Sequence, residues 1–315
     1  LYKKYTSNFI ATYTKDLSEK FELSLLAGNT IEDSNVKTDY LSGNGFLAPG
    51  IYNISNVSSD NQTITERIAR KRNVGVFGEI KLGYKNALFL NVTGRNDWSS
   101  TLPSTSRSFF YPSVGASAVL TDLFDIKSEG NGLSYLKLRS TWAQVGKDAP
   151  IGQLESYLVT QINGLGSTGY AYNGVDVGNA ALEPEFTNSW EIGFDSNFLN
   201  NRLSFNATYY KSISDNQILS DIRVPPTAGT FYATLNGGEI ENEGIEALLS
   251  IKLMPTNSDF QWDMSFNFGS NTTTVVDLPG ELKEVYLSDS WTFLNSAAGA
   301  GVLNASLFSL RGKRA

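Results

Sequence analysis

Apolar and polar residues alternate with a period of two along much of this 315-residue chain. In the stretch 203–209 the apolar residues are Leu203, Phe205, Ala207 and Tyr209, and the polar residues between them are Ser204, Asn206 and Thr208. The stretch 261–268, with the sequence QWDMSFNF, repeats the pattern. A period of two places alternate side chains on opposite faces of a β-sheet. The chain therefore favours strands that each have one apolar face and one polar face.

The same pattern predicts roughly ten strands, each near or above the length of about 9 to 11 residues that crosses a membrane at a tilt. The expected strands are 2–14, 20–30, 67–84, 87–97, 109–121, 134–146, 188–199, 201–215, 239–253 and 259–274. Their apolar side carries many aromatic residues, whereas residues such as Glu191 and Asp195 fall on the other side. A sheet that is apolar outside and polar inside is typical of an outer-membrane barrel. We therefore predict an all-β fold, an antiparallel transmembrane β-barrel.

The links between the expected strands differ sharply in length. Short links are expected at 16–19, 85–86, 200–201 and 255–259, long ones at 31–66, 147–187 and 216–238, and an intermediate one at 122–133. In outer-membrane barrels the short turns face the periplasm and the long loops face the exterior. The long links are therefore predicted to form the extracellular surface, and 122–133 to lie on the periplasmic side.

The composition excludes several functional classes. The chain has no cysteine and no histidine, which removes disulfides, thiolate metal sites, the commonest metal ligand and every catalytic triad that contains histidine. Its formal net charge of -7 argues against nucleic-acid binding, which requires a basic surface. We predict no catalytic residue, no metal site and no cofactor.

No stretch approaches the roughly 18 to 20 consecutive apolar residues of a membrane-spanning helix, so strands would have to provide any insertion into a membrane. Alternating strands also build soluble β-sandwiches, and a soluble β-rich binding or adhesin-like module is the main alternative. Several long loops without secondary structure are uncommon in soluble domains, which favours the barrel. A hydrolase is a weaker third alternative because the chain lacks histidine.

Two local motifs have ordinary interpretations. Residues 164–169, GLGSTG, match the glycine pattern of dinucleotide-binding folds, but no helical period follows them, so a loop is the better interpretation. Acidic clusters at 32–33 and 239–243 lack the spacing of a calcium loop, so we interpret them as solvated charges.

Aromatic residues in the long links are the candidate ligand contacts. The candidates are Trp98, Tyr170, Tyr172, Phe231, Tyr232 and Trp291. Their apolar rings could stack on sugars or hold peptide side chains. The alternative is that they form an aromatic girdle at the membrane interface or pack within the loops.

Ordered sequence blocks resemble one known family. The blocks are NVGVFGEIKLGYKNALFLNVTGRNDWSS at 73–100, FYPSVGASAVLTDLF at 110–124, YLKLRSTWAQVGKDAP at 135–150, ALEPEFTNSWEIGFDSNFLNNRLSFNATYYKSISDNQIL at 181–219, GGEIENEGIEALLSIKL at 237–253 and FQWDMSFNFGSN at 260–271. In this order they resemble the SusC/RagA family of TonB-dependent outer-membrane transporters. The resemblance covers most of the chain from about residue 67 onward.

The resemblance implies a barrel of about 22 strands in the bacterial outer membrane, of which this chain would form a partial wall of about ten. It implies import of a bulky nutrient, an oligosaccharide or an oligopeptide, in a Bacteroidetes-type bacterium. The implied partners are a SusD-like surface lipoprotein that closes over the loops, the TonB complex, outer-membrane lipid and the nutrient itself.

The whole chain, residues 1–315, is expected to be one barrel segment with long extracellular loops. The plug, the TonB box and the closing strand that the family implies are not visible in it, and neither is a signal peptide. We therefore expect the chain to be an internal segment of a transporter, forming barrel wall and extracellular mouth and carrying no chemistry of its own.

Overall fold

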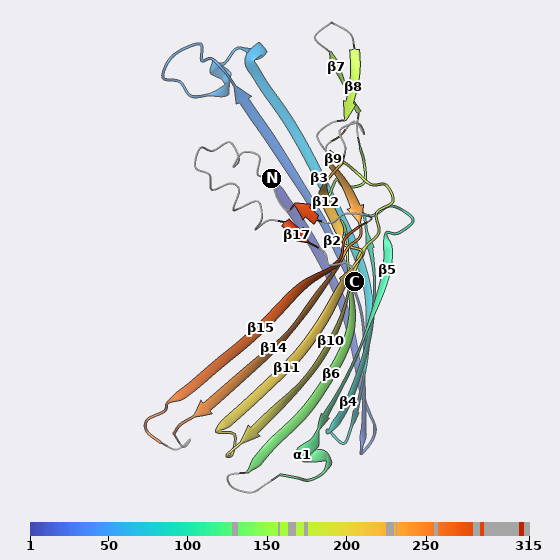
Figure 1. Cartoon of the computed structure of the whole chain (residues 1–315), viewed down its shortest axis with the longest axis vertical. Coiled ribbons are helices and arrows are strands. Elements are labelled where there is room, and N and C mark those ends of the chain that lie inside the picture. Colours follow the sequence, from blue (N-terminus) through green and yellow to red (C-terminus); the bar gives the residue numbers. More distant parts are fainter. Residues whose placement is uncertain are drawn as a thin grey trace.

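The computed structural model describes residues 1–127, 132–156, 158–162, 168–172, 176–224, 230, 232–254, 258–279, 284–286 and 309–311. Its main feature is a ten-stranded sheet (Figure 1). The strands are β1 (Tyr2–Ser18), β2 (Phe21–Gly43), β3 (Gln62–Tyr84), β4 (Leu88–Ser99), β5 (Ser108–Val119), β6 (Leu133–Lys147), β10 (Glu185–Phe198), β11 (Leu203–Asp215), β14 (Glu239–Lys252) and β15 (Asp263–Asp277). Each corresponds to one of the ten strands predicted from the sequence, so the all-β prediction is confirmed.

The sheet is a meander in which each strand pairs with its predecessor and its successor among these ten. Every pair within it is antiparallel, from β1 with β2 to β14 with β15. Strand β1 lies at one edge and β15 at the other, and the sheet does not close on itself. The chain therefore forms a curved wall and leaves one edge at each side unpaired.

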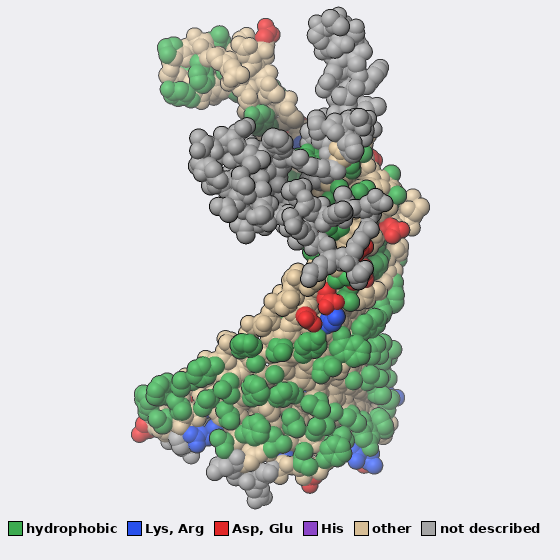
Figure 2. Space-filling model, in the orientation of Figure 1, with side chains coloured by type: hydrophobic (Ala, Val, Ile, Leu, Met, Phe, Trp, Pro, Cys, Tyr) green, Lys and Arg blue, Asp and Glu red, His purple; other side chains and the backbone are tan. Residues whose placement is uncertain are grey.

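One face of this wall is an apolar belt. Residues directly opposite each other in an antiparallel sheet lie on the same face. One register row runs across seven strands as Tyr13, Leu25, Ile80, Val92, Val114, Trp142 and Trp190. The exposed fractions of these side chains range from 36% for Trp142 to 57% for Tyr13. Figure 2 shows hydrophobic side chains gathered over the lower part of this face, with charged side chains at its margins. We call these outward apolar residues the belt.

The opposite face is polar. The register row one position away from the belt row runs through Glu79, Thr93, Ser113, Ala143, Ser189, Ser212, Asn242 and Thr273. Neighbours along it hydrogen-bond across strands: Thr93 and Ser113 share a bond of 2.5 Å, and Thr273 donates to Asn242 Oδ1 at 2.6 Å. The two faces predicted from the alternation are thus both present.

Short and long links lie at opposite ends of the sheet (Figure 1). The turn between β3 and β4 needs two left-handed residues, Lys85 and Asn86, with φ of 51° and 53°, as in a tight hairpin. The turn between β10 and β11 uses three such residues, 199–201. The intermediate link after β5 contains α1 (Leu120–Leu123).

The first long link is shorter than predicted. The sequence predicted a loop at 31–66, but β2 continues to Gly43 and β3 begins at Gln62. Cross-strand charge pairs hold this extension, including Lys4 with Glu32 at 2.9 Å. Because both faces are polar here, the alternation that reveals a half-buried strand is lost. Two short 3₁₀ turns, Ile54–Asn56 and Ser59–Asn61, lie in the remaining link.

The other long links contain short strands. They are β7 (Leu158–Ile162), β8 (Thr168–Tyr172), β9 (Asp176–Val177), β12 (Ile218–Arg223) and β13 (Tyr232–Asn236), with β16 (Glu284–Tyr286) and β17 (Ser309–Arg311) after the main sheet. Among the described residues, no helix is both long and apolar enough to cross a membrane.

Candidate functional site at the long-link end

At the end of the sheet that carries the long loops, the β4–β5 and β6–β10 links pack together, and Ile218 of the β11–β14 link packs against them. Their small apolar core consists of Leu102, Phe109, Ala149 and Leu182, each at most 6% exposed. Phe109 lies opposite Asp97 in the β4 and β5 register, which places it on the polar face. Loop residues from the β4–β5 link and the β6–β10 link therefore cover the inner side of the wall here. We call this packed region the mouth.

A glycine permits this packing. A Cβ atom at Gly146, near the end of β6, would lie 2.6 Å from Cδ2 of Phe109. Real Cβ contacts are not this short, so only glycine lets the β6 backbone pass over the Phe109 ring. The residues that follow, 148–149, can then reach the core.

Hydrogen bonds from side chains to loop backbone join the links to each other. Ser106 donates to the carbonyl oxygen of Leu182 at 2.5 Å. Asn236 donates to the carbonyl oxygen of Glu183 at 2.8 Å and accepts a bond from its backbone N–H at 2.9 Å. Asn216 donates to the carbonyl oxygen of Pro184 at 3.1 Å. The loop between β6 and β10 is thus tied to the loop between β11 and β14.

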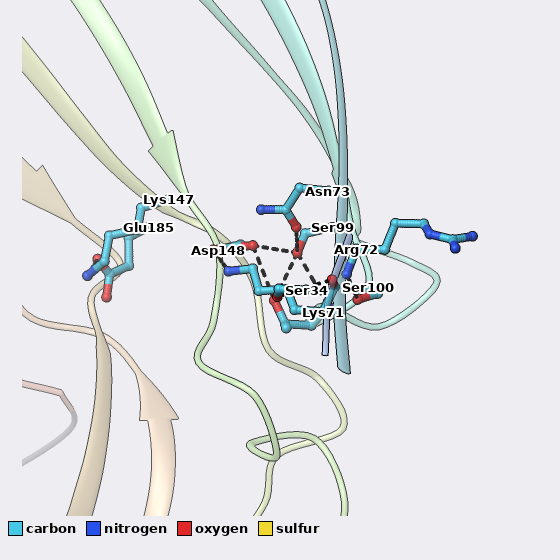
Figure 3. Close-up of polar contacts among 10 residues, drawn as sticks. Ser34, Lys71, Arg72, Asn73, Ser99, Ser100, Lys147, Asp148 and Glu185 are labelled. Atoms are coloured by element: carbon cyan, nitrogen blue, oxygen red, sulfur yellow. Dashed lines mark hydrogen bonds and ion pairs between the residues drawn. The ribbon is translucent and has the colours of Figure 1, made fainter. Parts of the chain in front are cut away.

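Asp148 joins three strands at the mouth (Figure 3). Its carboxylate accepts bonds from Lys71 Nζ of β3 at 2.7 Å and from Ser99 Oγ of β4 at 2.5 Å. Asp148 follows the last residue of β6, and its side chain is 14% exposed. Ser99 lies 2.9 Å from Asn73 Oδ1, which continues the network across β3. We call these four residues the Asp148 brace.

Below the mouth, the polar face carries a second ionic cluster. Arg95 Nε lies 2.8 Å from Asp97 Oδ1, and Tyr111 donates to Asp97 Oδ2 at 2.6 Å. The Arg95 guanidinium stacks over Phe77 at 5.5 Å from the ring centre. An added Cβ at Gly75 would collide with Asp97 Oδ1, so glycine makes room for the pair.

Charges also mark the upper limit of the belt on the outward face. Asp33 lies two residues beyond Ile31, an apolar residue on the same face of β2, and pairs with Arg70 at 2.9 Å and with Arg72. Hydrogen bonds from these two guanidiniums hold the pKa of Asp33 at about 2. The carboxylate is therefore ionised at neutral pH, which suits the aqueous side of a membrane interface.

The structure places the predicted aromatic contacts in different settings. Trp98 lies in β4 and not in a loop, opposite Val74 and Ser108 on the outward face, and is 40% exposed. Tyr232 begins β13, where it is half-buried and pairs with Arg223 of β12. Trp98 and Tyr232 are not brought into one site. Their part in ligand binding stays a prediction.

Tyr170 and Tyr172 belong to β8, but their side chains lie outside the described part, as do Phe231 and Trp291 altogether.

Sequence reasoning missed the Asp148 brace. A signal was present in the block RNDWSS at 95–100, where the alternation puts Arg95, Asp97 and Ser99 on one face and Trp98 on the other. The contribution of Asp148 had no signal, because it comes from a segment 49 residues beyond Ser99. Among the residues that the structure describes, no three His, Cys, Asp or Glu side chains cluster as a metal site.

A wall of antiparallel strands with an outward apolar belt, a polar inner face and loops at one end is the architecture of an outer-membrane β-barrel. Comparison with known proteins supports this architecture. The family model described as "TonB dependent receptor-like, beta-barrel" matches residues 2–302. The chain therefore belongs to the TonB-dependent receptor-like β-barrel family, and its place is the bacterial outer membrane.

Individual relatives indicate which type of TonB-dependent receptor the chain resembles. TonB-dependent receptor P26 of Formosa agariphila is 26% identical over 85% of this chain and 27% of its own length. TonB-dependent receptor SusC of Bacteroides thetaiotaomicron is 29% identical over 69% of this chain and 22% of its own length. The structure of the RagAB peptide transporter matches with a TM-score of 0.79 and 23% identity, over 92% of this chain and 32% of that one. The chain is thus a SusC/RagA-type barrel segment that spans about a third or less of these proteins.

Membership sets aside the soluble module considered from the sequence. The family is one of TonB-dependent receptors and not of enzymes.

Proposed function

We propose that the protein containing this segment imports a bulky polar nutrient, an oligosaccharide or an oligopeptide, across the outer membrane with energy supplied through TonB. The segment forms part of the barrel wall and part of the extracellular mouth. The observation that carries the proposal is the built mouth on the polar face, where the β4–β5 and β6–β10 links share one core and Ile218 of the β11–β14 link packs against it. A gate or receptor surface for a large polar solute needs such ordered loops above a polar lumen.

The relatives support the solute class. One is a structure titled a peptide transporter, and another is named SusC. We extend to this protein the two classes that the sequence suggested, and we propose a SusD-like surface lipoprotein as the partner that covers the loops.

The aromatic candidates receive separate roles in this proposal. Tyr232 lies in β13, the strand whose Asn236 is tied to the mouth, and we propose that it contacts the nutrient together with Tyr170, Tyr172, Phe231 and Trp291. Trp98 lies on the outward face beside Val74, so we assign it to the aromatic girdle at the membrane interface.

Uptake by cells of the source bacterium tests the function. Wild-type cells, cells lacking the gene and cells lacking TonB would receive fluorescent oligosaccharides and oligopeptides. We expect uptake of at least one probe that requires both the gene and TonB. Equal uptake by all three strains for every probe would contradict the proposal.

Paired variants then test the aromatic roles. Tyr232→Ala should raise the probe concentration for half-maximal uptake about three- to tenfold, because it removes an aromatic contact. Trp98→Ala is the matched control and should leave that concentration unchanged.

A further inference from the structure

Two arginines project from the outward face of β3 just above the belt. Residues 69–72 read ARKR, and the alternation places Arg70 and Arg72 on the outward face and Lys71 on the polar face, where it pairs with Asp148. In Figure 3 the Arg72 side chain points away from Lys71 and Asp148. The side chains of Arg70 and Arg72 are 59% and 55% exposed. The outward face therefore presents two guanidinium groups to the surroundings of the barrel.

Strand register sets the height of this pair relative to the membrane. Arg72 lies opposite Asp33, and the next outward row toward the belt holds Ile31, Val74 and Trp98. Ile31 and Trp98 are 41% and 40% exposed, as expected for side chains that face lipid. Two residues of a strand span about 7 Å, so the first guanidinium lies one step above this apolar row. That is the level at which lipid headgroups meet a membrane protein.

The two guanidinium groups converge on one carboxylate. Arg70 Nη2 donates to Asp33 Oδ2 at 2.9 Å, and Arg72 Nε donates to the same oxygen at 2.8 Å. Arg70 Nε and Arg72 Nη2 also donate to Asp33. Two cations that share a single carboxylate leave one positive charge unbalanced, and among the described residues nothing accepts from their Nη1 groups. The pair therefore retains donors and charge for a second anion.

The neighbouring charges on the outward face do not cancel this excess. Lys3 of β1 lies in the same register row as Arg70 and adds a third cation. The carboxylates of Asp39 and Glu66 lie farther from the belt and pair with Lys37 at 3.6 Å and 2.5 Å. Among the residues that the structure describes, the two arginine rows thus hold three cations and one carboxylate, in a chain whose total charge is negative.

We propose that Arg70 and Arg72 bind the phosphate group of a glycolipid headgroup in the outer leaflet of the membrane. Acyl chains of the same lipid lie against the row of Ile31, Val74 and Trp98 below. Guanidinium groups donate in forked pairs that match phosphate oxygens, and basic groups beside a membrane attract anionic headgroups. An amphiphile, unlike a soluble anion, uses both the cations and the apolar row. The site is on the outside of the wall and is independent of which nutrient passes through the lumen.

Lipid binding to the purified, delipidated full-length transporter in detergent tests the proposal. The probes are lipid A that carries its phosphate groups and the same lipid A after removal of those phosphates, with native mass spectrometry as the measure of each dissociation constant. Wild-type protein should bind the phosphorylated probe at least about tenfold more tightly, since one hydrogen bond to a charged group accounts for about tenfold or more. The combined variant Asp33→Asn, Arg70→Gln, Arg72→Gln removes all three charges and should bind the two probes equally tightly.

The single variant Asp33→Asn is a sharper test, because its expected effect has the opposite sign. It removes the carboxylate that competes for the guanidinium groups, so it should tighten binding of the phosphorylated probe about threefold, the size of an exposed ion pair, and leave the dephosphorylated probe unchanged. If the arginines serve only to join β2 to β3, Asp33→Asn would not tighten binding of the phosphorylated probe, and the proposal would be wrong.

Two controls separate this lipid site from general attraction of anions. Lys20→Gln with Lys85→Gln removes two cations from the short turns at the other end of the sheet and should leave the preference for the phosphorylated probe unchanged. Inorganic phosphate at the concentration of the probe should not displace it, because inorganic phosphate has no acyl chain to contact the apolar row. Equal binding of the two probes by wild-type protein, a preference that persists in the combined variant, or displacement by inorganic phosphate would each overturn the proposal.

Discussion

The membrane wall and the mouth are built from the same strands but are held together differently. In the wall, large apolar side chains such as Ile192 and Phe266 remain about half exposed, because lipid and not protein is their neighbour. In the mouth, Leu182 is fully buried, and loop backbone is satisfied by side chains such as Asn236. The wall therefore depends on backbone ladders and surrounding lipid, whereas the mouth has a small protein core of its own.

This difference separates the region that sets the shape of the barrel from the region that recognises a solute. A wall that relies on regular ladders tolerates variation in its side chains as long as they alternate, whereas a mouth that relies on particular contacts changes shape when one contact changes. Specificity for a solute is therefore expected to reside in the mouth and the lumen lining, and stability in the ladders.

The largest expected difference is between the two ends of the sheet, because the long-link end should face the cell exterior and the short-turn end the periplasm. Because residues 1–315 contain no cysteine, single cysteines report position without background from this segment. In intact cells, a maleimide on a polymer too large to cross the outer membrane should label Tyr52→Cys in the first long link and should not label Asn201→Cys in a short turn. Labelling of both after membrane disruption is the control. Labelling of the short turn in intact cells would reverse the orientation.

Charge insertion tests the two faces of the wall. Phe266→Arg places a cation in the belt and should lower the free energy of unfolding by about 2 to 4 kcal/mol near the bilayer midplane. Asn267→Arg, on the opposite face of the same strand, should cost far less because the lumen is wet. Urea unfolding of the full-length protein in lipid vesicles measures both. Equal losses of unfolding free energy in the two variants would contradict the assignment of lipid to one face and water to the other.

The sequence was sufficient for the wall because lipid on one side and water on the other impose a period of two on every strand. All ten strands of the main sheet were located from that period, including β11 and β15, whose alternation is unbroken over 203–209 and 263–268. The upper parts of β2 and β3 were missed because water lies on both sides there. Their pairing depends on charges such as Lys37 with Glu66, which have no period.

The contacts of the mouth could not be predicted from the sequence, for a different reason. Its contacts join residues far apart in the chain, such as Ser106 with Leu182 across 76 positions. No local pattern encodes such a pair, so the candidate residues could only be chosen by type. Aromatic character selected Tyr232, which lies in β13 of the link between β11 and β14, and Trp98, which lies on the outward face, without distinguishing them.

Truncation of the mouth core should have a smaller and more local effect than a charge in the belt. Leu182→Ala removes a fully buried side chain and should destabilise the mouth by about 2 to 3 kcal/mol, at the lower end for buried leucine because the core is small. Hydrogen exchange should rise in 148–156 and 179–184 and stay unchanged in the lower halves of β10 and β11. Ile192→Ala, in the lipid-exposed belt, is the control that should leave mouth exchange unchanged. Exchange that rises throughout the wall would mean that mouth and wall unfold as one unit.

The smallest effect is expected at the Asp148 brace. Asp148→Asn keeps the shape of the side chain but removes the charge that pairs with Lys71, and it should destabilise the local structure by about 1 to 2 kcal/mol, less than a whole hydrogen bond to a charged group because the amide oxygen still accepts. The segment that follows β6 should then open more often, which faster protease cleavage within 148–156 of the full-length protein would report. Lys147→Gln is the matched control, because its pairing with Glu185 involves a lysine side chain that is 71% exposed and therefore contributes little. If both variants are cleaved at the wild-type rate, the loop is held by the Leu182 core alone. If Lys147→Gln has the larger effect, the exposed pair and not the brace fixes the mouth to the wall.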